Sequence, residues 1–185
     1  MKSWALVLLL TAASMGRASA DPTADLESVR AAFGALHSVH AEMTTNTGLD
    51  VSVDWIEPNK VHVSAQNGMQ MIWIGSSRWV NMGSGWRSVP SGTTPMQTQM
   101  AIVRGSEFDR EVLSNDRISD EGMSVVRGIP AHKYRLAAKS GTDAWEIWVA
   151  NNLPVQVVQL GSGGEQRATI AYSRYNGVTD FGPPI

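Results

Sequence analysis

Histidine and carboxylate side chains near residue 40 are the first candidates for chemistry. His37, His40 and Glu42 follow a His-x-x-His-x-Glu spacing, and imidazole and carboxylate groups this close in sequence can bind a transition metal. The segment spans the expected end of a helix, however, so the three side chains should not share one face. His62 and His132 are isolated in the sequence. We therefore expect no metal site.

The remaining titratable residues do not form a catalytic pattern. Two carboxylate pairs, Asp109 with Glu111 and Asp120 with Glu121, could act as acid and base, but they lie in polar segments that we expect to be solvated. There is no G-x-S-x-G elbow, H-E-x-x-H, P-loop or G-x-G-x-x-G. The chain has no cysteine, which excludes thiol nucleophiles and cysteine zinc sites. We expect no catalytic residues, no cofactor and no enzyme activity.

The first twenty residues have the order of a secretory signal peptide. Lys2 supplies the positive region, residues 4–13 form an apolar run, and Ala18-Ser19-Ala20 is an A-x-A cleavage site. The run is shorter than the ~20 residues that a membrane-spanning helix needs. We expect cleavage after Ala20, release into the periplasm and a single mature domain over residues 21–185. A retained N-terminal anchor is the alternative.

The amino-acid composition limits the classes of partner that the chain can bind. The net charge is −2 over 185 residues, and the signal peptide carries basic residues but no acid, so the mature chain is more acidic still. Such a chain has no electrostatic attraction to nucleic acid or to an anionic membrane. Seven Trp and nine Met, against three Phe and three Tyr, offer large adaptable apolar surface for a core or for a pocket.

The apolar periodicity predicts one helix followed by a long antiparallel sheet. Leu26, Val29, Phe33 and Leu36 repeat at helical spacing, which predicts a helix over residues 25–39 with Asp21 or Thr23 as its N-cap. From residue 50 the period becomes two, and Gly, Pro and Asn mark tight turns. The expected strands are 50–56, 61–65, 69–74, 78–82, 86–89, 122–126, 131–136, 144–150, 155–160 and 167–175.

A helical insertion is expected between the two groups of strands. Met96, Met100 and Val103 lie at i, i+4 and i+7 after a loop rich in Pro, Gly and Ser, and Gly105 interrupts them. A second helical piece should carry Phe108, Val112 and Leu113. An apolar stripe with mobile ends can serve as a lid over a pocket or as fixed core, and the sequence leaves both open.

A curved sheet with Trp and Met on one face, closed by helices, is a natural pocket for an apolar ligand. In the last part of the sheet, Trp145 and Ile147 should face this pocket, while Glu146 and Trp148 face the other side. The candidate ligand-binding residues are Val53, Trp55, Met71, Trp73, Met96, Met100, Val103, Trp145 and Ile147.

Five segments together resemble a known superfamily. They are a Pro-x-Lys strand at 53–63, a Trp hairpin at 72–79, a Gly-Ile-Pro-Ala strand at 128–136, and the Trp and Leu-Pro segments at 145–149 and 153–155. In this order they resemble the periplasmic outer-membrane lipoprotein carrier proteins (LolA and LolB) and the LppX/LprG-type lipid-binding lipoproteins. The resemblance covers residues 24–185.

The resemblance implies a mostly β fold of the α+β class. This is an incomplete antiparallel β-barrel, or half-barrel, closed by an N-terminal helix and a central helical insertion around a hydrophobic cavity. Members carry acyl chains or lipids, or hold them for a partner. The chain departs from the pattern at His62, where the carriers often have an Arg that helps to latch their lid, and it lacks the N-terminal Cys of anchored members.

We therefore expect a soluble periplasmic carrier, monomeric, that holds an acyl chain, a lipid or an acylated protein and exchanges it with an envelope transporter or acceptor. The alternative is an envelope sensor or protein-interaction domain on the same half-barrel, without lipid transport.

Overall fold

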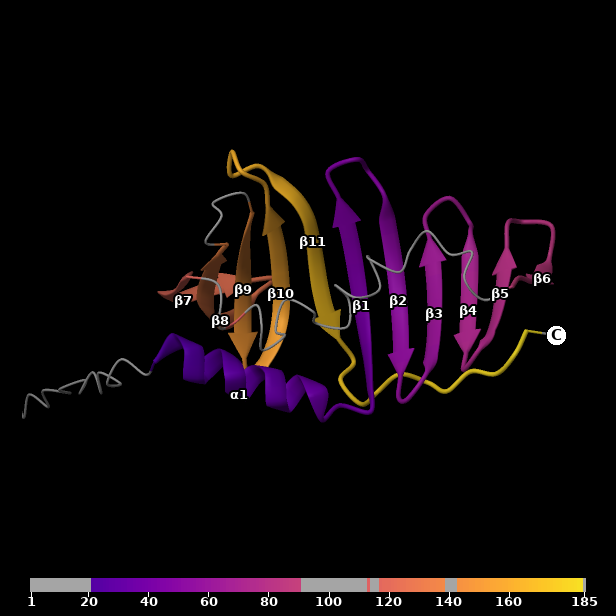
Figure 1. The fold of residues 1–185 in the computed structure, drawn as a ribbon, viewed down its shortest axis with the longest axis horizontal. Helices are drawn as coiled ribbons and strands as arrows, with labels where there is room; N and C mark the ends of the chain where they lie inside the picture. The colour runs from indigo at the N-terminus through magenta and orange to yellow at the C-terminus, as the bar shows by residue number, and fades with distance from the viewer. Residues whose placement is uncertain (1–20, 91–112, 114–116, 139–142, 185) are drawn as a thin grey trace, which may run out of the picture.

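The computed structural model describes residues 21–90, 113, 117–138 and 143–184. Within them, one helix accompanies a single antiparallel sheet of eleven strands (Figure 1). The elements are α1 (Pro22–Gly34), β1 (Ser38–Thr45), β2 (Asp50–Ile56), β3 (Lys60–Ala65), β4 (Gln70–Ile74), β5 (Ser77–Asn81), β6 (Trp86–Ser88), β7 (Arg117–Val126), β8 (Ile129–Ala137), β9 (Ala144–Ala150), β10 (Leu153–Leu160) and β11 (Gln166–Ser173).

Helix α1 has the predicted N-cap at Asp21, but it begins at Pro22 rather than at residue 25 and ends earlier than predicted. The Asp21 carboxylate Oδ1 accepts a hydrogen bond from the Thr23 N–H at 3.0 Å, which caps the helix. Leu26, Val29 and Phe33 form its buried stripe. The predicted end near Ser38 is wrong, because the helix stops at Gly34 and Ser38 already pairs with β2.

Removing the helix cap tests the boundary at Asp21. Asp21→Ala leaves the Thr23 N–H without its side-chain acceptor and is expected to lower the free energy of unfolding by about 1 kcal/mol. Urea titration of both proteins measures this. Thr23→Ala is the matched control, because Thr23 contributes only its backbone donor; an equal loss in both variants would contradict the capping role.

The sheet consists of two meanders joined at their centre. Strands β1 to β6 follow one another outward, β7 to β11 follow one another back, and β11 pairs with β1. This central pair brings His40 opposite Ser173 and Met43 opposite Ile170. Strands β6 and β7 are the two edges and do not pair with each other, so the sheet is not closed. The predicted mostly β, half-barrel architecture is confirmed in this respect.

Strand β1 is the strand that the periodicity analysis missed. Val39, Ala41 and Met43 alternate as buried residues on one face, but the helical spacing was extended to residue 39 and hid the start of this alternation. The other strands overlap those that the sequence predicts, but β7 begins at Arg117, five residues before the predicted start at residue 122. The predicted hairpin at Asn67 and Gly68 joins β3 to β4, and Gly68 has a positive φ of 82° there.

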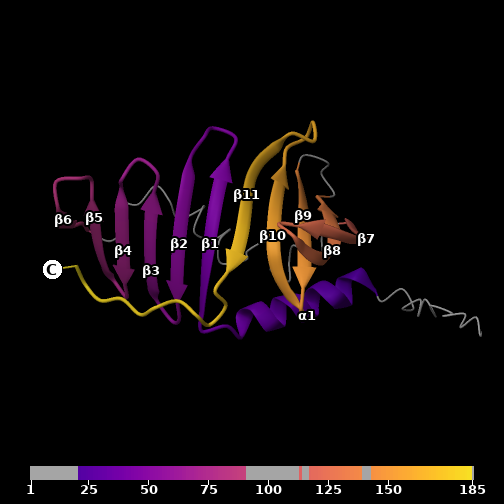
Figure 2. The same ribbon diagram turned by 180° about the vertical axis from the view of Figure 1, so that it is seen from behind.

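The two faces of the sheet differ in polarity. The face that carries the main apolar cluster, here called the inner face, packs against Leu26, Val29 and Phe33 of α1 and against the helical residue Leu113. The opposite, outer face carries charged residues and a small apolar cluster formed by Ala144, Val158 and Leu160. Figure 2 shows α1 lying across the same end of strands β8 to β10 when the sheet is seen from behind.

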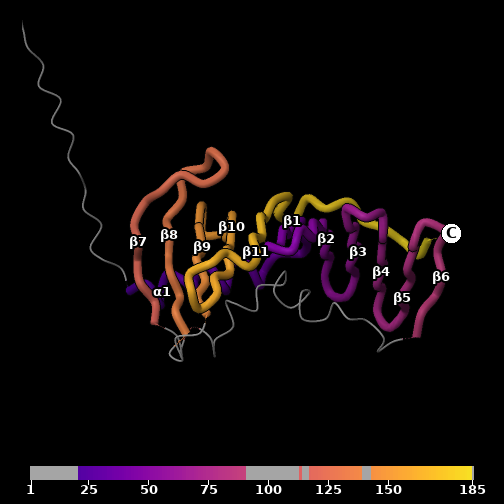
Figure 3. Tube along the Cα trace, turned by 90° about the horizontal axis from the view of Figure 1, so that it is seen from above, coloured from indigo at the N-terminus to yellow at the C-terminus, as the bar shows by residue number. Residues whose placement is uncertain are grey.

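The C-terminal segment 174–184 turns at residues 175–176 and is tied to the sheet. It runs past the ends of β1 to β5 in all three overall views (Figure 3). The Asn176 side-chain oxygen accepts hydrogen bonds from the His37 and Ser38 N–H groups at 2.7 and 3.4 Å. Further along, the Lys60 ammonium lies 2.5 Å from the Asp180 carboxylate.

Candidate functional site

The six predicted ligand-binding residues within the described part of the chain gather in one apolar cluster on the inner face. They come from β2 (Val53, Trp55), β4 (Met71, Trp73) and β9 (Trp145, Ile147). Strand pairing places them: Val63 lies opposite both Val53 and Met71, and Val61 lies opposite both Trp55 and Trp73. The other three predicted residues, Met96, Met100 and Val103, lie outside the described residues, as do Phe108 and Val112.

Burial divides these six residues into two groups. Val53, Trp55, Met71 and Ile147 are between 0 and 7% exposed and pack as core. Trp73 and Trp145 are only partly buried and pack against that core from its margins. Of the six, these two tryptophans therefore offer apolar surface to a ligand without displacing the core.

The two faces of β9 are as the alternation predicts. Trp145 contacts the inner cluster, whereas Trp148 packs against the outer cluster. The Trp148 indole N–H donates to the Ser124 hydroxyl at 2.9 Å, and the Lys133 ammonium lies 5.0 Å from the centre of the Trp148 ring. Trp148 is thus a structural residue of the outer face.

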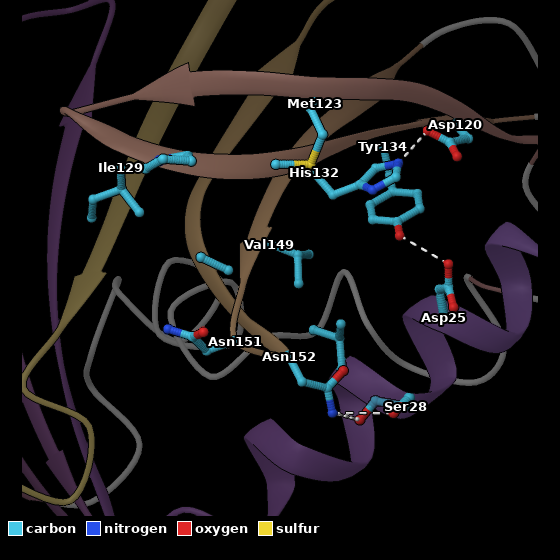
Figure 4. A pocket seen from close by; sticks show the side chains of 13 residues that line it. Asp25, Ser28, Asp120, Met123, Ile129, His132, Tyr134, Val149, Asn151 and Asn152 are labelled. Carbon is cyan, nitrogen blue, oxygen red and sulfur yellow. Dashed lines mark hydrogen bonds and ion pairs between the residues drawn. The ribbon is translucent and has the colours of Figure 1, made fainter. Parts of the chain in front are cut away.

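A groove of about 830 Å³ lies at the α1 end of the inner cluster. Helix α1, strands β7 and β8 and the turn between β9 and β10 supply its walls (Figure 4). Val29, Tyr134 and Val149 line the groove and also belong to the inner cluster or pack against it, so the groove opens onto the edge of the cluster. None of the predicted ligand-binding residues of the described part lines it.

One wall of the groove is polar and internally bonded. The Tyr134 hydroxyl donates to the Asp25 carboxylate at 3.0 Å, and the His132 Nε2 lies 2.5 Å from the Asp120 carboxylate. The His132 and Tyr134 rings stack with their centres 4.8 Å apart. The hydrogen bond from His132 and that from the Gly122 N–H hold the pKa of Asp120 below its usual range.

This wall is not among the sites predicted from the sequence. Asp120 and Glu121 are expected there as a solvated pair, and His132 as an isolated residue. The fold separates the two carboxylates, because Asp120 meets His132 while Glu121 meets the Lys133 ammonium at 2.9 Å. Asp120 and His132 come together through the pairing of β7 with β8. The predicted strand 131–136 contains His132, so pairing it with the preceding strand was the one available indication of this contact.

The His37, His40 and Glu42 spacing does not form a metal site in the structure. His40 lies on the outer face, where its Nδ1 is 2.7 Å from the Asp54 carboxylate, and the Arg174 guanidinium lies 2.8 Å from the same oxygen. Glu42 is 3.8 Å from His40. Among the described residues, no group of three His, Asp or Glu side chains is arranged to hold a metal ion.

His62 lies on the face opposite the inner cluster. It pairs with Asp54 across β2 and β3, and its ring centre is 5.7 Å from that of Phe181 in the C-terminal segment. Burial keeps the pKa of His62 below its usual value and outweighs the opposing effect of Asp54. Because its side chain is on the outer face, His62 does not contact a ligand held on the inner face or a lid over that face.

No helix within residues 21–90, 113, 117–138 and 143–184 is long and apolar enough to span a membrane.

Comparison with known proteins identifies the fold. No model of a known protein family matches the sequence, and no curated protein matches it either. Among solved structures, the lipoprotein LppX of Mycobacterium tuberculosis superposes with a TM-score of 0.64 at 18% identity, covering 86% of this chain and 97% of that one. LprF of Mycobacterium bovis gives 0.63 at 14% identity, covering 88% and 96%. The predicted resemblance to LppX/LprG-type proteins is thus confirmed at the level of fold.

A second group of similar structures contains MucB. A chain of the MucA/MucB complex of Pseudomonas aeruginosa matches with a TM-score of 0.54 at 15% identity, and MucB alone with 0.56 at 13%. This chain covers only 56% and 61% of the length of those two chains, although 85% and 90% of its own residues are matched. This fold therefore occurs both in the lipoprotein LppX and in MucB, which assembles with MucA.

Proposed function

We propose that this chain is a periplasmic binding protein that holds an acyl chain, a lipid or an acylated protein against its inner face and performs no chemistry. In this proposal residues 1–20 are removed after Ala20, and residues 21–185 act as one monomeric domain. An envelope transporter or acceptor would deliver or receive the ligand.

The observation that carries the proposal is the continuity of the inner apolar cluster across both meanders. It extends from Val80 on β5 through the central strands to Ile118 on β7, and its margins include the partly buried Trp73 and Trp145. Apolar surface that leaves water on binding contributes about 25 cal/mol per Å². The likeness of the fold to LppX and LprF supports this use of the inner face.

Direct analysis of the purified protein tests the proposal. Protein isolated from the periplasm is extracted with organic solvent, and the extract is analysed by mass spectrometry. We expect an acyl-containing molecule in a near-stoichiometric amount. Another exported protein, purified in the same way, is the control; equal lipid in both extracts, together with no saturable binding of a fluorescent fatty acid, would contradict the proposal.

Two tryptophans on opposite faces of β9 provide a paired test. Trp145→Phe removes part of the margin of the inner cluster and is expected to weaken binding of a fluorescent fatty acid about fivefold, which corresponds to ~1 kcal/mol. Trp148→Phe is expected to leave the affinity unchanged, since Trp148 faces the outer cluster. Fluorescence titration measures both. Equal effects would show that the probe does not bind on the inner face.

A second function, that of an envelope sensor or protein-interaction domain, is favoured by the β7–β8 hairpin. Met123, Val125 and Ile129 are 68, 71 and 41% exposed there, and β7 is an edge strand. Exposed apolar side chains on an unpaired edge are typical of a contact with another protein. The MucA/MucB complex shows that this fold can assemble with a protein partner.

The molecular mass of the native protein, measured in periplasm that is isolated under mild conditions, distinguishes the two functions. A defined complex with a second protein, lost on Val125→Ser but kept in Trp145→Phe, would support the interaction domain. A monomer that carries lipid in both variants would support the carrier.

A further inference from the structure

Two buried hydrogen-bond donors lie at the β4–β5 end of the inner cluster. The indole Nε1 of Trp73 and the guanidinium Nε of Arg78 are buried, and neither has a hydrogen-bond partner among the residues that the structure describes. Buried polar groups are nearly always paired, and an unpaired one costs about 1–3 kcal/mol. A pair of such donors therefore indicates a place where an acceptor binds.

The strand register places these two donors side by side. Trp73 of β4 lies opposite Arg78 of β5, so both side chains project from the same face. The Arg78 guanidinium carbon is 4.8 Å from the centre of the Trp73 ring, in the geometry of a cation–π contact. Contact with the ring holds the guanidinium in place and leaves its Nε–H available to donate.

Arg78 differs from several other cations of the sheet in its pairing. Lys60, Lys133 and Arg174 each form an ion pair with a carboxylate on the outer face or in the C-terminal segment. No carboxylate of the described residues forms an ion pair with Arg78, and its only observed contact of this kind is the Trp73 ring. A guanidinium in this state is suited to an oxyanion, because it donates to carboxylates and phosphates in a fork geometry.

Apolar surface lies directly beside the two donors. Val80 lies opposite Met71, two residue pairs along the strands from Trp73 and Arg78 and therefore on the same face. Met71 belongs to the buried core, whereas Met69, Trp73 and Val80 are only partly buried against it. An alkyl chain can lie on these partly exposed side chains while its head group reaches the donors.

We propose that Trp73 and Arg78 bind the anionic head group of a single-chain amphiphile, such as the carboxylate of a fatty acid, whose alkyl chain lies on the inner cluster. The inference rests on the proposed function, since it names the chemical class of the ligand held there. Arg30 has a third buried and unpartnered Nε, but α1 shows no second donor of this kind beside it.

The test compares ligands that differ only in their head group. Decanoate, decanol and decylamine, each below its micelle concentration, are titrated into the mature protein, with acetate as the anion without a chain. Isothermal titration calorimetry measures the affinities. We expect decanoate to bind about tenfold more tightly than decanol, the size expected for a hydrogen bond to a charged group, decylamine to bind more weakly than decanol, and acetate not to bind.

Three variants assign the effect to residues. Arg78→Gln is expected to remove the preference for decanoate and to leave the affinity for decanol unchanged, and Trp73→Phe to reduce the preference while keeping an aromatic ring. Arg135→Gln is the matched control, because Arg135 lies opposite Glu146 on the outer face and forms an ion pair with it there, away from Trp73 and Arg78. Urea unfolding confirms that each variant folds.

The outcomes separate this inference from the proposed function. Equal affinities for decanoate and decanol that Arg78→Gln does not change would overturn the inference while the carrier function stands. Binding of acetate as tight as that of decanoate would also overturn it, because it would show a site for free anions. Failure of every ten-carbon ligand to bind would overturn both.

Discussion

Replacing Ile147 by alanine is expected to lower the free energy of unfolding by about 2–5 kcal/mol, the usual cost of truncating a fully buried Ile or Leu. Ile147 is 0% exposed and lies on β9 opposite Tyr134 of β8 and Val157 of β10, in the middle of the inner cluster. The neighbouring strands prevent collapse of the space that the lost carbons leave. Urea or thermal unfolding followed by circular dichroism measures the change.

This substitution also separates core from ligand site, since Ile147 was predicted from the sequence to bind the ligand. Val125→Ala on β7 is the control: its side chain is 71% exposed and the loss should stay within about 0.5 kcal/mol. A small loss of stability in Ile147→Ala, combined with weaker binding of a fatty-acid probe, would contradict the core assignment and restore Ile147 as a ligand contact.

Truncation of Phe33 is expected to have a similarly large effect, about 3–5 kcal/mol for Phe33→Ala. Phe33 is 6% exposed and meets the Tyr172 ring edge to face, with ring centres 5.3 Å apart and planes at 76°. This contact joins the last turn of α1 to β11, at the centre of the sheet. Its loss should therefore release the helix from the inner face as well as destabilise the fold.

Hydrogen exchange of the α1 amides and urea unfolding together measure this effect. Phe33→Leu keeps most of the buried volume and should cost clearly less than the alanine variant. Glu27→Ala on the exposed side of the same helix should leave stability within about 0.5 kcal/mol. Protection of α1 that is unchanged in Phe33→Ala would show that other contacts hold the helix.

The elements of the fold were largely predictable because their signals are local. The cap at Asp21, the period-two alternation in β2 and β3 and the turn at Gly68 depend on residues close together in the chain. The prediction was wrong at the end of α1, where Leu36 is buried at helical spacing although it lies in a loop. There, the pairing of Ser38 with β2 competes with the helix and ends it. A local stretch of sequence around residue 38 does not include β2, so it does not reveal this competing pairing.

The candidate site was predictable in part. Alternation correctly assigned Val53, Trp55, Met71, Trp73, Trp145 and Ile147 to one face, but it could not tell core from margin, because burial depends on what covers each residue. It did not include Arg78, since an arginine in a strand is normally expected to be solvated. Only the pairing of β4 with β5, which places Arg78 over Trp73, reveals its unpartnered donor.

The amino-acid sequence alone determined the secondary-structure types, the strand order within each meander and the polarity of the two faces, because these follow from side-chain spacing and from turn residues. Only the tertiary structure decided that β1 pairs with β11, that Asp120 meets His132, and that the groove opens beside α1. The β1–β11 pairing and the groove join residues far apart in the chain, and the contact of Asp120 with His132 depends on the β7–β8 pairing. Which of these contacts forms depends on all the alternative strand pairings and on the entropy cost of closing long loops. A local sequence pattern does not contain this information.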